Sequence, residues 1–460
     1  RQRQMCIRDS LFSYQRTKSP NESSDQRSAY QRDYDRIIFS SAFRRLQNKT
    51  QVFPLPGSVF VHNRLTHSLE VSSVARSMGS LVGQFIAKNY DLNETAYDFY
   101  MHSLADVLSS AALCHDIGNP AFGHSGEDAI ASYFDRHSTD LKSHFTEEQW
   151  TDLIYFEGNA NAIRILTQQQ SGKSEGGLRL TYSTIASIAK YPCESIARKK
   201  SILHRKKFGF FQSEKETFRH IAEATNMVQE SNPPMIFKRH PFVFLVEAAD
   251  DICYNIIDVE DSHRLGIIDH DKCKDLFLNL IASLNPEQIE KTNSNLKNIS
   301  DKNDRIAYLR AKSINSLTQK SVEVYQNNIE LILQGNFDYA LLDVIKNDTE
   351  KITKKVLSEI QRFSIANIYN HRSVVEIENA GYNVMSELLT QFIPPILKEA
   401  QERKSYEKKA LKLVPAQFMY DDKMPYERVL GILDYVSGMT DNYATELYRR
   451  IKGIEIGMHI

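Results

Sequence analysis

The sequence has 460 residues, of which 41% are hydrophobic and 25% charged, and its formal net charge is −1. This composition is typical of a globular protein with a large core, and the bulk charge provides no attraction to nucleic acid or to a membrane surface. Glycine and proline number 18 and 13 residues, below their usual shares of roughly 7% and 5%. Because both residues favour turns, their scarcity indicates a mostly helical fold.

The cysteines and the hydropathy pattern indicate a cytoplasmic protein. The five cysteines are scattered without CxxC spacing, as expected for reduced thiols in the cytosol. No apolar run approaches the roughly 18 residues of a membrane span, and no apolar stretch typical of a signal peptide follows the charged start. We therefore expect no membrane partner.

Three segments are expected along the chain. Residues 1–10 show no helical periodicity and look like a non-native leader, so we leave them out of the fold prediction. Residues 11–280 carry the polar motifs described below and are expected to form the catalytic core. Residues 281–460 are expected to form a helical C-terminal region packed on this core.

The elements expected in chain order are mainly helices. Apolar spacing predicts one helix from Thr66, as N-cap, to about Lys88. Residues 51–62 read as strand–turn–strand around Leu55–Gly57, and the polar residues 285–305 read as a flexible connection. Further helices are expected over 34–46, 96–115, 126 onward, 147–168, 181–190, 241–258, 305–335, 349–370, 373–403 and 426–452. The predicted fold class is thus all-α, with a minor β-hairpin and a helical C-terminal extension.

Two imidazoles and two carboxylates form a candidate metal site: His67, His115, Asp116 and Asp250. Asp250 lies within an otherwise apolar helix, where a carboxylate is costly unless it is paired or bound to a cation; pairing with an arginine is the structural alternative. Imidazole with carboxylate suits a single divalent metal, Mg or Mn foremost, with Fe, Ni, Co or Zn compatible. Four protein ligands leave room for water or a phosphate oxygen on a six-coordinate ion.

His124 and Glu127 are three residues apart, so their side chains can meet on one helical turn. A carboxylate beside an imidazole fixes its tautomer and raises its basicity, as a general acid–base requires. The alternative is an ordinary surface pair, but the neighbouring metal motif favours catalysis.

Several residues are candidates for substrate contacts. Arg64, Lys190, Lys206 and Lys207 suit phosphate groups, although a solvated basic turn is the simpler interpretation of the last two alone. Tyr191 and Tyr254 can stack on a base or sugar, or pack in the core. Asp258 shares a helix face with Asp250 and Tyr254, and can bond a ribose hydroxyl or cap a neighbour.

Many of these motifs occur together in one known family. The matching segments are Asp35–Ile38, Ser40–Leu46, Lys49–Val52, Arg64–Val71, His115–Pro120, Phe122–His124, Phe156–Ala160, Lys190–Pro192, Glu247–Asp261, Asp434–Tyr435 and Gly438–Asp441. In this order and from about residue 30 to the C-terminus, the sequence resembles the deoxyguanosine-triphosphate triphosphohydrolase (dNTPase) family of the HD superfamily.

The resemblance implies an α-helical HD fold and hydrolysis of dGTP, or several dNTPs, to the deoxynucleoside and inorganic triphosphate. It implies His67, His115, Asp116 and Asp250 as metal ligands, and His124 backed by Glu127 as the catalytic pair. It places Gln51, Arg64, Lys190, Tyr191, Lys207, Tyr254 and Asp258 at substrate contacts. Members are often hexamers and some are activated by dNTPs, so a homo-oligomer and a dNTP activator are expected.

Two other functions stay open at this point. One is a different HD phosphohydrolase, such as a 5′-nucleotidase or a phosphodiesterase. The other is a catalytically weak nucleotide sensor or a single-stranded nucleic-acid-binding protein, which the intact metal set argues against and the near-zero net charge does not support. The sequence does not specify which dNTP is preferred.

Overall fold

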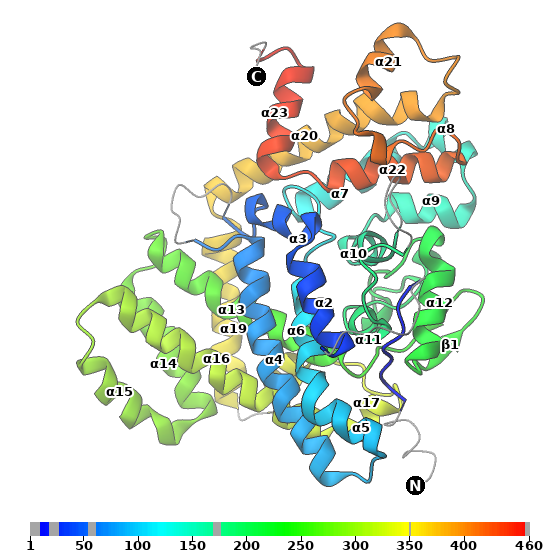
Figure 1. Cartoon of the computed structure of the whole chain (residues 1–460). Helices are drawn as coiled ribbons and strands as arrows, with labels where there is room; N and C mark the ends of the chain where they lie inside the picture. The colour runs from blue at the N-terminus through cyan, green and yellow to red at the C-terminus, as the bar shows by residue number, and fades with distance from the viewer. Residues whose placement is uncertain (1–9, 18–26, 54–60, 169–175, 349–350, 456–460) are drawn as a thin grey trace.

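The computed structural model describes residues 10–17, 27–53, 61–168, 176–348 and 351–455 (Figure 1). Within these ranges nearly all regular structure is helical, which confirms the predicted all-α class. The single sheet among them pairs β1 (Gln229–Ser231) with β2 (Ile236–Phe237) in antiparallel fashion. The hairpin was expected over 51–62, of which residues 54–60 lie outside the described ranges. In the described part the prediction was wrong, because residues 51–53 are irregular and the pairing is limited to one isolated bridge between Thr50 and Asn63.

Helix α4 (Arg64–Asn89) runs through the centre of the molecule beside α6 (Leu104–Cys114) (Figure 1). Its N-cap is Asn63, whose side chain accepts hydrogen bonds from the backbone of Leu65 and Thr66. The expected cap, Thr66, is instead the N3 residue that completes a capping box, so the prediction of Thr66 as N-cap was wrong by one turn. Gly79 allows close packing, since a Cβ there would lie 2.8 Å from Cα of Ala105.

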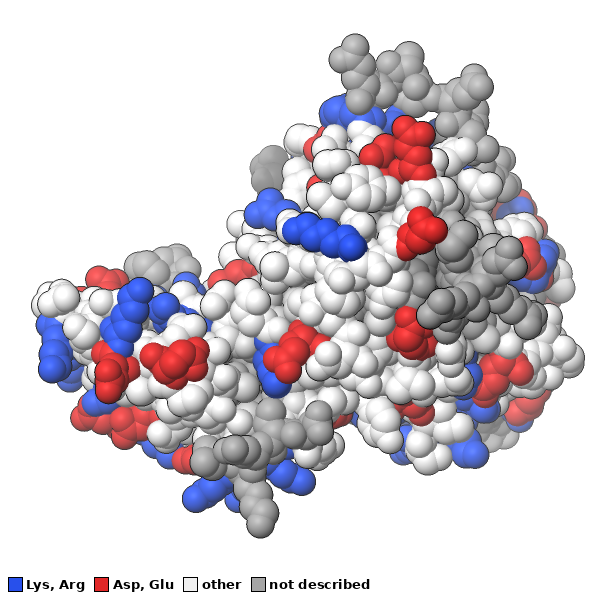
Figure 2. All heavy atoms as spheres, turned by 90° about the horizontal axis from the view of Figure 1, so that it is seen from below, with Lys and Arg blue, Asp and Glu red and all other residues white. Residues whose placement is uncertain are grey.

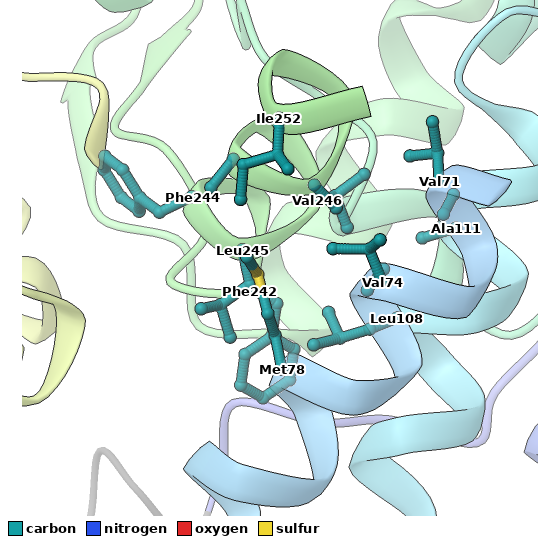
Figure 3. Packing of buried hydrophobic residues seen from close by; sticks show 14 of the residues in the cluster. Val71, Val74, Met78, Leu108, Ala111, Phe242, Phe244, Leu245, Val246 and Ile252 are labelled. Carbon is teal, nitrogen blue, oxygen red and sulfur yellow. The ribbon is translucent and has the colours of Figure 1, made fainter. Parts of the chain in front are cut away.

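The main core lies where α4 and α6 meet α13 (Val243–Arg264). Figure 3 shows this packing, with all the labelled side chains buried: Val71, Val74 and Met78 from α4, Leu108 and Ala111 from α6, and Phe244, Leu245, Val246 and Ile252 from α13 with Phe242 at its N-cap. Each large aliphatic or aromatic side chain buried here stabilises the fold by about 1.5–3 kcal/mol. This packing fixes three helices that carry polar residues of the candidate site.

Several expected helices are divided. In the described residues, the segments 34–46, 305–335, 349–370 and 426–452 each consist of more than one element, and so do two segments that carry residues of the candidate site. The segment 96–115 consists of α5 (Glu94–Asp98), the π-helical turn η2 (Phe99–Ser103) and α6. The segment 147–168 consists of α9 (Glu147–Ile154) and α10 (Gly158–Thr167), separated by an extended Glu157. The Glu157 side chain accepts a hydrogen bond from the backbone N–H of Asn159 and so caps α10. This break places Glu157 at the candidate site.

The expected flexible connection over 285–305 is helical, contrary to the prediction. It contains α15 (Ile289–Lys297) and the start of α16 (Lys302–Asn327), whose N-cap Asp301 accepts a hydrogen bond from the backbone of Asp304. Leu296 and Ile306 are buried in the main core, so tertiary packing outweighs the polar local composition. The neighbouring elements are α14 (His270–Leu284), η7 (Pro286–Gln288), α17 (Ile329–Leu333), α18 (Leu341–Asp348), α19 (Lys351–Phe363) and the π-helical η8 (Ser364–Tyr369).

A second hydrophobic cluster lies at the top of Figure 1 and joins α7 (His124–Arg136) to the C-terminal helices. These helices are α20 (Arg372–Leu397), α21 (Ser405–Leu411), α22 (Pro425–Ser437) and α23 (Asp441–Ile451). Tyr133 and Phe134 of α7 share the cluster with Leu388 and Phe392 of α20 and Val429 of α22. The region 281–460 is therefore shared between two clusters, and a boundary at residue 280 stays a prediction.

The remaining elements are short and connect these layers. They are α2 (Ala29–Ile38), α3 (Ser41–Arg45), η1 (Leu46–Asn48), α8 (Ser138–Leu141), η3 (Lys142–His144), α11 (Tyr182–Ala186), η4 (Ser195–Ala197), η5 (Leu203–Arg205), η6 (Gln212–Glu214), α12 (Lys215–Ala224) and η9 (Ala416–Phe418). On the face shown in Figure 2, charged side chains of both signs are interspersed. In the part of the chain that the structure describes, each helix is too short or too polar to cross a membrane.

Candidate active site

Three helices bring the predicted metal ligands together. His67 lies in the first turn of α4, His115 and Asp116 follow the last residue of α6, and Asp250 lies on α13. Donor atoms of His67, His115 and Asp116 all lie within 4.8 Å of one another. Oδ1 of Asp250 is 3.2 Å from Nε2 of His67 and 3.4 Å from Nε2 of His115. The four residues predicted from the sequence therefore meet at one point.

The protonation of His115 shows that these residues suit a cation. Its Nδ1 lies 2.6 Å from the carbonyl oxygen of Ala112, so Nδ1 carries the proton and donates. Its Nε2 is buried without a hydrogen-bond partner and lies 3.6 Å from a carboxylate oxygen of Asp116 and 3.4 Å from one of Asp250. Burial opposes a charge on His115, but Asp116 and Asp250 outweigh burial and raise its pKa to about 9. This point therefore favours a positive charge, which a proton on Nε2 or a divalent metal supplies.

Both carboxylates have fixed cationic or amide partners. Arg64 donates to Oδ2 of Asp116 at 2.8 Å and Asn119 donates to Oδ1 at 2.6 Å. Although burial opposes ionisation, Arg64 and the nearby imidazoles lower the pKa of Asp116 to about 2. Lys190 donates to Oδ2 of Asp250 at 2.8 Å, so Asp250 is paired with a lysine, not with the arginine considered as its structural alternative.

His124 and Glu127 form the expected pair at the start of α7. Nδ1 of His124 lies 3.0 Å from Oε2 of Glu127, and Oε1 of Glu127 accepts a 2.8 Å hydrogen bond from the backbone N–H of Gly158. The Glu127 hydrogen bond raises the pKa of His124. Burial opposes ionisation of Glu127, but His124 and the Lys207 ammonium lower its pKa. The His124 side chain is 84% exposed, so this imidazole is open to a ligand.

A cavity of about 490 Å³ contains both groups. Its lining includes these residues of the sequence prediction: Gln51, Arg64, His115, Asp116, His124, Glu127, Lys190, Tyr191, Lys207, Asp250 and Tyr254. His67 and Asp258 are buried and are not part of the lining. The Asp258 carboxylate accepts a 2.7 Å hydrogen bond from Tyr369, which stacks on Tyr254 with 5.5 Å between ring centroids. Asp258 therefore reaches the cavity only through Tyr369, and its predicted sugar contact stays a prediction.

Glu157 and Tyr369 belong to the cavity but were not predicted as site residues. Lys207 lies 2.8 Å from a Glu157 oxygen and 3.9 Å from Oε2 of Glu127, so one ammonium lies close to both carboxylates. Glu157 falls in the matching segment Phe156–Ala160. The charge and aromatic character of the two residues were the available signal.

One wall of the cavity comes from the C-terminal region. Val374, Ile377 and Glu378 of α20 line it, beside Phe122 and Gly123 from the loop that precedes α7. The two aliphatic residues have the spacing of an ordinary core-facing helix stripe, which is why sequence inspection did not assign them to a site. The cavity thus combines charged groups from the central helices with an apolar wall.

Comparison with known proteins agrees with this arrangement. The HD-domain family model matches residues 64–186, and the model described as a phosphohydrolase-associated domain matches residues 349–450. A deoxyguanosinetriphosphate triphosphohydrolase-like protein of Synechocystis sp. is 38% identical over 94% of this chain and 95% of its own length. One from Listeria monocytogenes is 32% identical over 95% and 96%. A Yersinia pestis protein named deoxyguanosinetriphosphate triphosphohydrolase is 28% identical over 93% and 94%. The chain belongs to the deoxyguanosinetriphosphate triphosphohydrolase-like family of HD-domain phosphohydrolases.

Proposed function

We propose that this protein is a metal-dependent dNTP triphosphohydrolase, which converts dGTP or several dNTPs to the deoxynucleoside and inorganic triphosphate. The observation that carries the proposal is the shared cavity: the exposed His124, held by Glu127, opens into the same space as the His–His–Asp cluster. The names of the relatives support the same substrate class.

A divalent metal held by His67, His115, Asp116 and Asp250 would supply Lewis-acid polarisation of the α-phosphate, with Mg or Mn as the first candidates. The protein itself supplies positive charge for the triphosphate. Arg64 donates to Asp116, Lys190 donates to Asp250, and both cations line the cavity. Lys207, which also lines the cavity, lies close to the carboxylates of Glu157 and Glu127. These cations offset the negative charge of the triphosphate while the bond between its α-phosphorus and the deoxynucleoside oxygen breaks.

His124 is the proposed proton carrier. Its Nδ1 is occupied by Glu127, so Nε2 is the atom available for exchange with the attacking water or the leaving deoxynucleoside oxygen. Glu127 is held in turn by the Gly158 N–H and by Lys207, which keeps the imidazole oriented before substrate arrives. The stacked Tyr254 and Tyr369 form the proposed sugar-binding side.

Further properties follow by likeness to the family and are part of the proposal. We propose a cytoplasmic homo-oligomer, with a hexamer expected, whose activity responds to dNTPs as activators. Light scattering of the purified protein measures its mass. Rate measurements with dNTP mixtures at fixed total concentration test activation, because a rate above the sum of the single-substrate rates requires a second nucleotide effect.

The decisive experiment supplies each of the four dNTPs and GTP, with Mg or Mn, and separates the products by ion-exchange chromatography. Deoxynucleoside with intact triphosphate is the expected result, and GTP is expected to react poorly. Monophosphate with pyrophosphate would contradict the assignment of the leaving group. A parallel incubation with a deoxynucleoside monophosphate tests the alternative, because release of inorganic phosphate from it, without reaction of the triphosphates, would identify a 5′-nucleotidase. Binding without turnover under every condition would favour a nucleotide sensor.

A further inference from the structure

The C-terminal segment Asp434–Asp441 contacts the active-site loop through a buried acid. Asp441, the first residue of α23, is fully buried, and its two carboxylate oxygens bind two separate backbone segments. Oδ2 accepts a 2.8 Å hydrogen bond from the N–H of Thr50, and Oδ1 accepts a 2.9 Å bond from the N–H of Phe122. Thr50 and Phe122 both line the cavity, whereas Asp441 does not.

The loop that Asp441 holds has an unfavourable backbone conformation. Phe122 has φ +61° and Gly123 has φ +58°, and a bulky residue in the left-handed region requires support from its surroundings. The next residue is His124, the first residue of α7. The direction of the His124 side chain therefore depends on a turn whose backbone conformation is unfavourable for phenylalanine.

A second contact from the C-terminal region acts on the same residue. A Cβ at Gly381 of α20 would overlap Cγ of Phe122, so the glycine lets the helix lie directly against the phenylalanine ring. Phe122 is thus held on its backbone by α23 and on its side chain by α20.

The other end of the loop is held by the same segment. Lys49 donates to the carbonyl of Asn119 at 2.6 Å and to the carbonyl of Ser437 at 2.9 Å. Asn161 donates to the carbonyl of Gly118 at 2.7 Å and to Oγ of Ser437 at 3.2 Å. Residues 118–123, which connect the predicted metal ligand Asp116 with His124, are therefore linked at one end to Ser437 through Lys49 and Asn161, and bonded at the other end directly to Asp441.

We infer that Asp441 is a positioning residue: by fixing the Phe122 N–H it sets the left-handed turn that orients His124 against the metal cluster. The inference rests on the proposed function for its catalytic consequence, but its structural content does not. A substitution should release the turn without removing a group that touches substrate. The expected signature is a fall in kcat with little change in KM, and faster amide exchange confined to the loop.

The neighbouring Thr440 provides a matched control. It is the N-cap of α23, and its hydroxyl accepts from the N–H of Tyr443. Thr440→Ala weakens the start of the same helix but leaves both bonds of Asp441 in place. Asp441→Asn keeps the shape of the side chain, yet its amide group faces either the Thr50 or the Phe122 N–H and cannot accept from it.

The experiment compares wild type, T440A and D441N by product release, metal content and hydrogen–deuterium exchange over residues 118–124. We expect D441N to lose roughly 10- to 100-fold in kcat, with KM within about twofold and metal content unchanged, and to exchange faster at the loop. T440A should keep the wild-type kcat and loop protection, even if its melting temperature falls as far as that of D441N. Equal kcat and equal loop exchange in the two variants would overturn the inference.

Gly381→Ala is the second variant if D441N does not fold. Alanine favours a helix, so α20 itself is not weakened, while the added Cβ displaces Phe122 and should reproduce the loss of kcat and of loop protection. A wild-type kcat in G381A despite faster loop exchange would contradict the inference, because it would show that the turn at Phe122 does not orient His124. A wild-type protein that releases no triphosphate would refute the proposed function instead, and the exchange comparison would still decide whether Asp441 holds the loop.

Discussion

Tyr369 donates a 2.7 Å hydrogen bond to Oδ2 of Asp258, and this bond joins the turn before α20 to the helix that carries Asp250. Burial raises the pKa of Asp258 to about 8, and the hydrogen bond from Tyr369 opposes this shift by stabilising the carboxylate. The same Tyr369 ring stacks on Tyr254 at the cavity. One tyrosine thus links a buried acid to the proposed sugar-binding side.

Tyr369→Phe should preserve the ring stack and remove the hydrogen bond. Leaving a buried polar group without its partner costs about 1–3 kcal/mol, so we expect a lower free energy of unfolding and a several-fold higher KM for dNTP with less effect on kcat. Urea denaturation and steady-state kinetics measure both. The exposed Tyr406 offers the control Tyr406→Phe, and equal behaviour of the two variants would contradict the role of Tyr369.

His124→Ala should abolish turnover, because it removes the proposed proton carrier. General acid–base catalysis contributes about 10²- to 10⁴-fold, and the metal ligands are untouched, so metal content and nucleotide binding should stay at wild-type values. Calorimetric titration with a dNTP and metal analysis accompany the rate measurement. Turnover at the wild-type rate would show that His124 is not catalytic.

A divalent metal should raise the thermal stability of wild type. A ligand at 100 times its dissociation constant stabilises the folded state by about 2.7 kcal/mol. His115→Ala removes the imidazole whose Nε2 has no other partner, so its melting temperature should no longer respond to added Mn²⁺. The exposed His144 supplies the control His144→Ala, which should respond like wild type. A full response in His115→Ala would place the metal elsewhere.

His62 should make folding stability depend on pH above neutrality. Burial lowers the pKa of His62, but hydrogen bonds to Asp261 and Glu70 outweigh burial and raise it to about 10. A raised histidine pKa stabilises the folded state fully below the unfolded value of about 6.5, and this stabilisation is lost as the pH rises through about 10. Hydrogen bonds between charged groups contribute about 1.5–3 kcal/mol.

The measurement compares wild type with His62→Gln by urea denaturation at pH values from 6 to 10. Wild type should be the more stable of the two at pH 6, and the difference should shrink towards pH 10. A difference in unfolding free energy that stays constant over this range would contradict the raised pKa of His62.

The cluster of His67, His115, Asp116 and Asp250 could be predicted from the sequence because these polar residues stand in unusual local surroundings. Asp250 is a carboxylate among apolar helix residues, and such a residue needs a counter-charge wherever the chain folds. His124 and Glu127 were recognisable because an interaction three residues apart depends only on local helix geometry. These inferences did not require knowledge of the tertiary arrangement.

Other features depend on contacts that local sequence does not encode. Residues 285–305 are polar enough to read as a loop, and become helical because Leu296 and Ile306 reach the main core. Asn63 is the N-cap of α4 and Thr66 is the N3 residue of the same capping box. Both side chains can cap a helix, so the local sequence does not distinguish which of them begins it. Tyr369 and the α20 wall meet the metal cluster only through long-range packing, so neither could be assigned to the site beforehand.

One face of helix α20 both lines the cavity and packs against Phe122. Val374, Ile377 and Glu378 line the cavity and Gly381 admits Phe122, at positions i, i+3, i+4 and i+7. Adding or deleting a single residue within this stretch would turn the later positions by about 100° relative to the earlier ones, so the wall and the glycine notch would no longer face the same side. Length variation among relatives should therefore collect in the loops around α20 and spare its first three turns.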